Sequence, residues 1–137
     1  MLGDTLKPSA LTKLYLHGAS IKHGGGIALA QALRTNSALT VLAIGDNQIG
    51  DRGAIALASA LRVNDKLVEV YMPRNGITDA GVAELAEALK TGNKTLHTML
   101  LFEYTGIEEA LLREVKLALA GRELAARGSL KRAEAPA

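Results

Sequence analysis

The 137-residue sequence predicts one α/β domain, a short right-handed solenoid of about four β-α repeats with a parallel sheet on the concave face and helices on the convex face. A repeated frame begins at Leu11, recurs at a constant interval at Leu39 and Leu67, and returns in a degraded form at Leu96, one position later than that interval expects. Within each copy, apolar residues are spaced first by two and then at helical intervals, which indicates a strand followed by a helix. Hydrophobic residues make up 48% of the chain but aromatic residues only 3%, which suits the narrow strand-helix slot of a solenoid.

The best-formed copy covers residues 39–66. Leu42 and Ile44 are alternate residues, so an extended chain directs both side chains to one face. Asp51, two residues before Gly53, is the expected N-cap of the helix that follows. One face of that helix collects apolar side chains, those of Ile55, Leu57, Ala58 and Leu61.

The head of this copy, from Leu39 to Asn47, fits the pattern L-x-x-L-x-L-x-x-N. The chain from Leu11 to Leu119 therefore resembles leucine-rich repeat proteins of the ribonuclease-inhibitor-like class, whose repeats have about 28 or 29 residues and contain a helix. The resemblance implies that Asn47 and Asn75 form a ladder of buried amides, each bonding backbone groups of its own and the adjacent repeat. Similar repeats occur in NOD-like immune receptors, tropomodulin and the Ran GTPase-activating protein, so the resemblance specifies the fold and leaves the partner open.

The frame divides the chain into a remnant of a preceding repeat or partial cap at residues 1–10, four repeats at 11–38, 39–66, 67–95 and 96–120, and the end of a capping helix with a disordered tail at 121–137. Repeats 1 and 4 depart from the pattern, because Ala19 and Tyr104 stand where the asparagine is expected. The other expectations concern helix ends. We expect left-handed residues at Asn64 and at Gly92 or Asn93, a last helix over about Glu108 to Arg127, and water-facing side chains at Glu114, Lys116 and Arg122.

Several functional classes are disfavoured by the composition. The chain has no cysteine, and its net charge of +2 comes from interspersed charges, so we expect neither a thiolate site nor nucleic-acid binding. It has no apolar window of membrane-spanning length and no signal-peptide pattern, which predicts a cytoplasmic protein without membrane contact. His23 begins a His-Gly-Gly-Gly run, but no Gly-x-Ser-x-Gly elbow accompanies it, so a non-enzyme is predicted. His17 and His97 are expected on different faces, so neither a metal nor another cofactor is predicted.

The candidate binding residues are those whose side chains point to the uncovered side of the four predicted strands. Three of the four aromatic residues lie there, Tyr15, Tyr71 and Phe102, and aromatic anchors beside a shallow pocket are typical of interaction hot spots. Ala43 and Gly45 are expected to leave a dip between the two tyrosines, which stand roughly 10 Å apart if two strand spacings separate them. The predicted protein-binding residues are Lys13, Tyr15, His17, Glu69, Tyr71, Arg74, Leu100, Phe102 and Glu103, and the other outward positions are Val41, Ala43, Gly45, Pro73 and Thr98.

The leading functional hypothesis is a non-catalytic module that binds a protein or peptide on the concave face. A first alternative is a self-associating solenoid, a homodimer that pairs through the uncapped strand edge at residues 11–16. A second alternative is a repeat domain of a GTPase activator, an immune receptor or a bacterial effector, because such proteins contain similar repeats.

Overall fold

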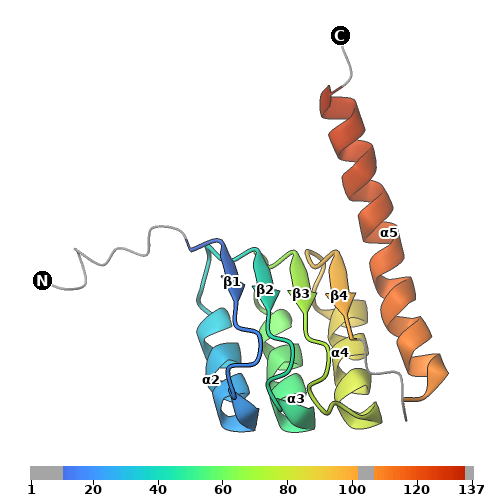
Figure 1. The fold of residues 1–137 in the computed structure, drawn as a ribbon. Helices are drawn as coiled ribbons and strands as arrows, with labels where there is room; N and C mark the ends of the chain where they lie inside the picture. The colour runs from blue at the N-terminus through green and yellow to red at the C-terminus, as the bar shows by residue number, and fades with distance from the viewer. Residues whose placement is uncertain (1–10, 102–106, 135–137) are drawn as a thin grey trace, which may run out of the picture.

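The computed structural model has the repeated β-α architecture that the sequence predicts (Figure 1). It describes residues 11–101 and 107–134, with side chains through Arg122. Strands and helices alternate in the order β1 (Lys13–Tyr15), α2 (Lys22–Leu33), β2 (Val41–Ala43), α3 (Gly50–Leu61), β3 (Glu69–Tyr71), α4 (Asp79–Thr91), β4 (Thr98–Leu100) and α5 (Glu109–Glu134). No helix among these residues is long and apolar enough to cross a membrane.

The four strands form one parallel sheet in the order β1-β2-β3-β4, and helices α2, α3 and α4 lie side by side along one face of it (Figure 1). The register pairs Leu14 with Leu42, Leu42 with Val70, and Val70 with Met99. Each residue therefore has its equivalent in the next repeat as its neighbour in the sheet, and columns of equivalent side chains run across the strands.

The core is the slot between the strands and helices. Leu42 and Val70 are fully buried and Met99 is 7% exposed, as predicted for the inner column of the sheet. Leu14, the equivalent residue of repeat 1, is only half-buried, because its outer side meets no further repeat within the described residues. Ile55 was expected on the buried helix face but is 42% exposed, and Ala54 takes the buried position.

The starts of α4 and α5 receive hydrogen bonds from a carboxylate of the preceding repeat, which corrects the expected role of Asp51. Asp51 lies inside the first turn of its own helix α3 and does not cap it. Its carboxylate instead accepts hydrogen bonds from the backbone N–H groups of Thr78 (2.7 Å) and Gly81 (3.1 Å), and from the Thr78 hydroxyl, at the start of α4. A Cβ at position 81 would stand 2.5 Å from Asp51 Oδ1, so glycine permits this approach. Asp79 repeats the arrangement one unit later, accepting from the Glu108 N–H at 2.7 Å.

Asn47 and Asn75 form the predicted ladder at the strand ends, and both side chains are buried. The Asn47 amide donates to the Leu16 carbonyl (2.6 Å), while its oxygen accepts from the Ala19 N–H (2.8 Å). Asn75 bonds repeat 2 in the same way. Its amide donates to the Ile44 carbonyl and its oxygen accepts from the Asn47 N–H, both at 2.9 Å. Each asparagine thus satisfies backbone groups of the repeat before it, which a first repeat has no need to do. This direction explains why Ala19 is tolerated in repeat 1.

A second asparagine ladder runs along the turns between each helix and the next strand. Asn64 and Asn93 do not adopt the expected left-handed conformation, and neither does Gly92. Both asparagines are buried, and each amide donates to the preceding turn: Asn64 to the Leu33 carbonyl (2.7 Å) and Asn93 to the Leu61 carbonyl (2.9 Å). Their side-chain oxygens accept from N–H groups of their own turn, those of Leu67 and Leu96, so each asparagine joins two successive turns.

The last helix is longer than expected and closes this second ladder. α5 continues past the expected end at Arg127 to Glu134, and in Figure 1 it extends well beyond the sheet. Arg122 was expected to face water, but it is half-buried and donates to the carbonyls of Leu89, Asn93 and Leu96 and to Asn93 Oδ1. It occupies the position, one repeat after Asn93, where the asparagine of a further repeat would be. A guanidinium therefore ends the row of amides.

Candidate functional site

The side of the sheet that faces away from α2, α3 and α4 carries three columns of side chains, which we call the concave surface. The first column contains Lys13, Val41, Glu69 and Thr98, and the second contains Tyr15, Ala43, Tyr71 and Leu100. The third lies just past the strands and contains His17, Gly45 and Pro73. These are positions at which the sequence predicts outward side chains.

The second column contains the two tyrosines. Tyr15 is 64% exposed, and Tyr71 and Leu100 are half-buried. The Tyr71 hydroxyl donates to Glu69 Oε1 at 3.0 Å, so it is tied to a carboxylate of the first column. Burial, together with this hydrogen bond and the negative charge of Glu69, raises the pKa of Tyr71. The hydroxyl therefore stays protonated and serves as a donor.

The expected dip between the tyrosines is shallower than predicted. Gly45 is buried, and a Cβ there would lie 3.0 Å from Pro73 Cγ and 3.1 Å from His17 Nδ1, so the side chains of repeats 1 and 3 close over it. Val41 is only 5% exposed although it points outward. The register places Lys13 and Glu69 on either side of Val41, and the aliphatic stems of such long side chains cover a shorter neighbour. Ala43 remains half-buried between the tyrosines.

A charged cluster lies at the end of the concave surface where the strands lead into the loops. Arg74 holds the Asp46 carboxylate at two points, Nε to Oδ1 at 2.9 Å and Nη2 to Oδ2 at 2.7 Å. His17 Nε2 lies 3.2 Å from the same Oδ2. The hydrogen bond from Arg74 lowers the pKa of Asp46, which stays ionised to more acidic pH than an isolated aspartate. This cluster links repeats 1, 2 and 3.

The predicted binding residues thus fall into two groups with one addition. Tyr15, Tyr71, Leu100, Lys13 and Glu69 lie together on the first two columns, whereas His17 and Arg74 converge on Asp46. Sequence reasoning missed Asp46, although Arg74 carries the opposite charge at the same position of the next repeat. In a solenoid, residues exactly one repeat apart are neighbours. Phe102 and Glu103 lie outside the described residues.

The concave surface combines apolar and charged groups. It offers aromatic rings, a protonated phenol, a carboxylate and a bidentate arginine pair, all on short strands or the loops that follow them. Across the part of the chain that the structure describes, no group of three or more His, Cys, Asp or Glu side chains is placed to hold a metal ion. His17 pairs with Asp46 on the surface, with 63% of its side chain exposed.

Comparisons with known proteins agree with this architecture. Residues 35–58 match the family model described as leucine rich repeat. A comparison with curated proteins finds no match. In a comparison of structures, 43 solved chains match, among them one titled Leiomodin-1 Actin-Binding Site 2, with 16% sequence identity, a TM-score of 0.67, and coverage of 97% of this chain and 94% of that chain. At this identity the likeness shows the fold. Domains of this fold generally serve protein interaction and are typically non-catalytic. The family match over residues 35–58 and the four parallel β-α units together show that the chain has the leucine-rich repeat fold, with repeats like those of the ribonuclease-inhibitor-like type.

Proposed function

We propose that the protein is a non-catalytic interaction module that binds a protein or peptide on its concave surface. The observation that supports this most is the exposure of Tyr15, which is 64% exposed on strand β1, in the same column as the half-buried Tyr71 and Leu100. A large aromatic side chain gains little from this position in the isolated chain, whereas it contributes strongly when a partner buries it.

The surroundings of Tyr15 fit an interaction hot spot. Tyr71 and Leu100 extend the apolar column across the sheet, and the short side chain of Ala43 lies between the two tyrosines. Lys13 and Glu69 border this column with charges of opposite sign. Because the Tyr71 hydroxyl is already held by Glu69, its ring is fixed before a partner arrives, which reduces the entropy lost on binding.

The charged cluster supplies orientation at the edge of this surface. Asp46 and the bidentate Arg74 are held together across two repeats, with their side chains 40% and 62% exposed. Exposed pairs of this kind contribute little to stability, roughly 0 to 1 kcal/mol. Their complementarity with a partner sets specificity and association rate more than affinity. The partner that fits is therefore a protein segment with an apolar side chain for the tyrosine column and charged groups next to it.

The test is a pull-down or proximity-labelling experiment with Tyr15→Ser and Tyr71→Ala proteins. Both variants are expected to keep the far-ultraviolet circular dichroism of the original protein and to lose captured partners by at least about tenfold, since hot-spot truncations cost about 2 kcal/mol or more. The matched control is Ile55→Ala, which removes an exposed apolar side chain from helix α3. Equal capture by all four proteins would refute the proposal.

Actin is the first individual partner to test, because the solved chain with the same fold is titled as an actin-binding site. Co-sedimentation with filaments, and gel filtration with monomeric actin, would report binding directly. Loss of binding in Tyr15→Ser but not in Ile55→Ala would place actin on the concave surface.

Self-association is the competing candidate. Leu11 is 58% exposed, and Leu14 and Leu16 are half-buried at the outer edge of repeat 1. Sedimentation velocity over a hundredfold range of concentration separates the two functions. A monomer throughout would leave the concave surface as the binding site, whereas a dimer abolished by Leu11→Glu would favour self-association.

A further inference from the structure

Among the described residues, strand β4 is an edge of the sheet. On its paired side β4 meets β3, with the Met72 N–H donating to the Leu100 carbonyl at 3.0 Å. Between β2 and β3, the inner column continues this pattern, since the Ile44 N–H donates to the Tyr71 carbonyl at 2.8 Å. Leu101 is the equivalent of Ile44 and Met72 in repeat 4, so its N–H points to the far side of β4. No strand pairs with that side within residues 11–101 and 107–134.

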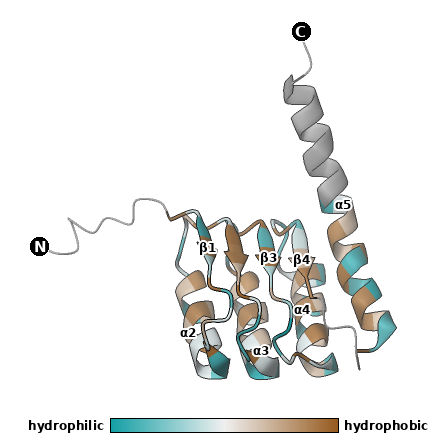
Figure 2. Cartoon of the chain, in the orientation of Figure 1, coloured by the Kyte–Doolittle hydropathy of each residue, from teal (hydrophilic) through white to brown (hydrophobic). Residues whose placement is uncertain are grey.

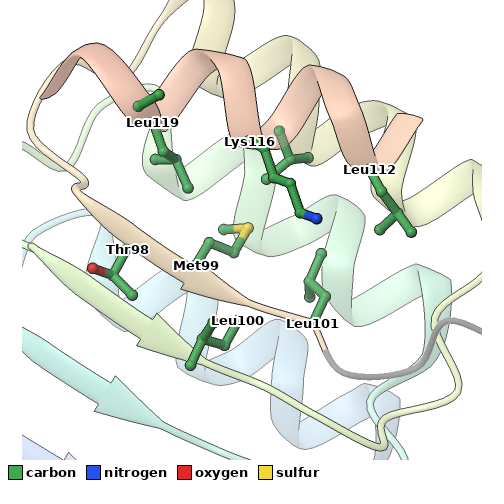
Figure 3. A pocket seen from close by; sticks show the side chains of 9 residues that line it. Thr98, Met99, Leu100, Leu101, Leu112, Lys116 and Leu119 are labelled. Atoms are coloured by element: carbon green, nitrogen blue, oxygen red, sulfur yellow. The ribbon is translucent and has the colours of Figure 1, made fainter. Parts of the chain in front are cut away.

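An apolar groove runs along this edge, with helix α5 as its opposite wall (Figure 3). It has a volume of about 340 Å³. Side chains from both faces of the strand line it, Met99 and Leu101 from the inner column and Thr98 and Leu100 from the outer positions, so the groove follows the backbone edge. The lining residues from α5 are Leu112, Val115, Lys116, Leu119 and Ala120.

The space beside repeat 4 fits a single added strand better than a further β-α repeat. α5 packs against α4, and Arg122 fills the turn position that a fifth repeat would use. Helix α5 therefore occupies the place of a further helix, and only the place of a further strand beside β4 is unoccupied by the described residues. A second copy of this chain would bring α2 together with β1 and would collide with α5. An isolated extended peptide brings a backbone and alternating side chains alone, which is what the edge and the groove accept.

One charged side chain, Lys116, gives the groove a positive charge. Figure 3 shows the Lys116 side chain extending from α5 into the space above β4. Lys116 is exposed and forms no ion pair or hydrogen bond with the described residues. Its neighbours on the same helix, Arg113 and Glu114, are paired with Glu109 and Lys90. Because Lys116 is exposed, its ammonium attracts a carboxylate only modestly, but it favours an acidic over a basic ligand.

We propose that this groove binds an extended acidic peptide segment of a partner protein, which adds to β4 as a fifth strand. Its backbone pairs with the open edge at Leu101, two apolar side chains at alternate positions pack beside Met99 and Leu101, and a glutamate or aspartate meets Lys116. This site adjoins the concave surface, with which it shares Thr98 and Leu100, but it lies at the opposite end of the sheet from Tyr15.

The probe is a fluorescein-labelled octapeptide in which valine alternates with glutamate and threonine, measured by fluorescence anisotropy against the full chain. Saturable binding is expected, with affinity reduced roughly threefold to fivefold when glutamine replaces glutamate or when Lys116→Glu is used. A peptide with proline at its central valine should bind as poorly, because proline cannot donate to a strand edge. Amide hydrogen exchange at Leu101 should slow when the peptide is added.

Two control variants keep the test sharp. Lys66→Glu makes the same charge change on an exposed residue of the turn before β3, and it should leave the affinity unchanged. Tyr15→Ser should also leave it unchanged, which separates this site from the concave surface. Three results would overturn the proposal: no binding at millimolar peptide, equal binding by the proline peptide, or equal binding by Lys116→Glu. Self-association that competes with the peptide would also overturn it, because a second copy would then occupy the groove despite α5.

Discussion

The two ends of the described solenoid differ. At the repeat 4 end, helix α5 carries Arg122, which bonds the preceding turn, whereas no described residue before β1 covers repeat 1. At the first of these ends, the Arg122 guanidinium donates to the Leu89 and Asn93 carbonyls just as the Asn93 amide donates to Leu61 and Asn64. At the other end, Leu11 is 58% exposed.

The difference follows from the direction of the hydrogen bonds. Each ladder asparagine donates to carbonyls of the preceding repeat, so a first repeat receives these bonds while a last repeat receives them only if something replaces the missing asparagine. Apolar packing has no such direction, because both end repeats lose one neighbour. The two ends therefore pose different problems, a polar one at repeat 4 and an apolar one at repeat 1. Between the two ends, strand β2 is coloured hydrophobic in Figure 2, and its neighbours β1 and β3 are more hydrophilic.

Truncation of the inner column should show the largest effect. Leu42→Ala is expected to lower the free energy of unfolding by about 3 kcal/mol, because it opens a cavity at a fully buried site. Leu14→Ala, the same change at the half-buried edge position, should cost about half as much. Urea denaturation followed by circular dichroism measures both. Equal losses would mean that repeat 1 is as well covered as repeat 2.

Removal of the terminal guanidinium should come next. Arg122→Ala is expected to lower the free energy of unfolding by about 2 kcal/mol, because the half-buried carbonyls of Leu89 and Asn93 lose a charged donor. Partial burial also lowers the pKa of Arg122, although not enough to remove its charge near neutral pH. Arg113→Ala is the control on the same helix, since its side chain is 70% exposed. If the two variants unfold at the same denaturant concentration, Arg122 does not terminate the ladder.

The capping carboxylate between repeats 2 and 3 should give the smallest effect, and one that depends on pH. Burial alone would raise the pKa of Asp51, but hydrogen bonds from Thr78 and Gly81 outweigh it and lower the pKa below the usual 3.8. Because the folded pKa lies below the unfolded one, the contribution of Asp51 is complete above about pH 4 and is lost as the pH falls through the folded value. Asp51→Asn should cost about 1 kcal/mol at neutral pH and flatten the acid limb of the stability curve.

Asp65→Asn provides the comparison for that measurement. Asp65 is exposed and its side chain accepts no hydrogen bond from the described residues. Thermal unfolding between pH 2 and pH 7 should follow the original protein for Asp65→Asn and depart from it for Asp51→Asn. Parallel curves for the two variants would show that the bonds from Thr78 and Gly81 do not stabilise the fold.

The sequence predicts the repeat architecture well because apolar spacing reports directly on burial in a solenoid. Leu42, Val70 and Met99 lie where the repeat frame puts them, and Asn47 and Asn75 form the ladder that the family resemblance implies. Apolar residues define the repeat frame, but some polar residues recur at the same interval. Asn36, Asn64, Asn93 and Arg122 follow one another at intervals of one repeat, and that spacing alone identifies the second ladder and its last member.

Features that depend on the shape of a neighbouring side chain were not predictable in this way. Alternation places Val41 and Gly45 on the outward face, and they point there, but their burial depends on the lengths of Lys13, His17 and Pro73 in adjacent repeats. The role of Asp51 was wrong for a related reason, since its carboxylate reaches a backbone N–H in the next repeat instead of one in its own helix. Binding by the concave surface stays a prediction.

The one-way hydrogen bonds of the asparagines have a consequence for synthesis on the ribosome. The turn after β1 is complete only when Asn47 has emerged to bond Leu16 and Ala19, and the turn after β2 must wait in the same way for Asn75. Growth from the N-terminus at roughly 5–20 residues per second therefore leaves the newest repeat unfinished for a second or more at each step. During each delay the slot of the newest repeat stays open, and transiently exposed apolar surface of this kind is what chaperones bind.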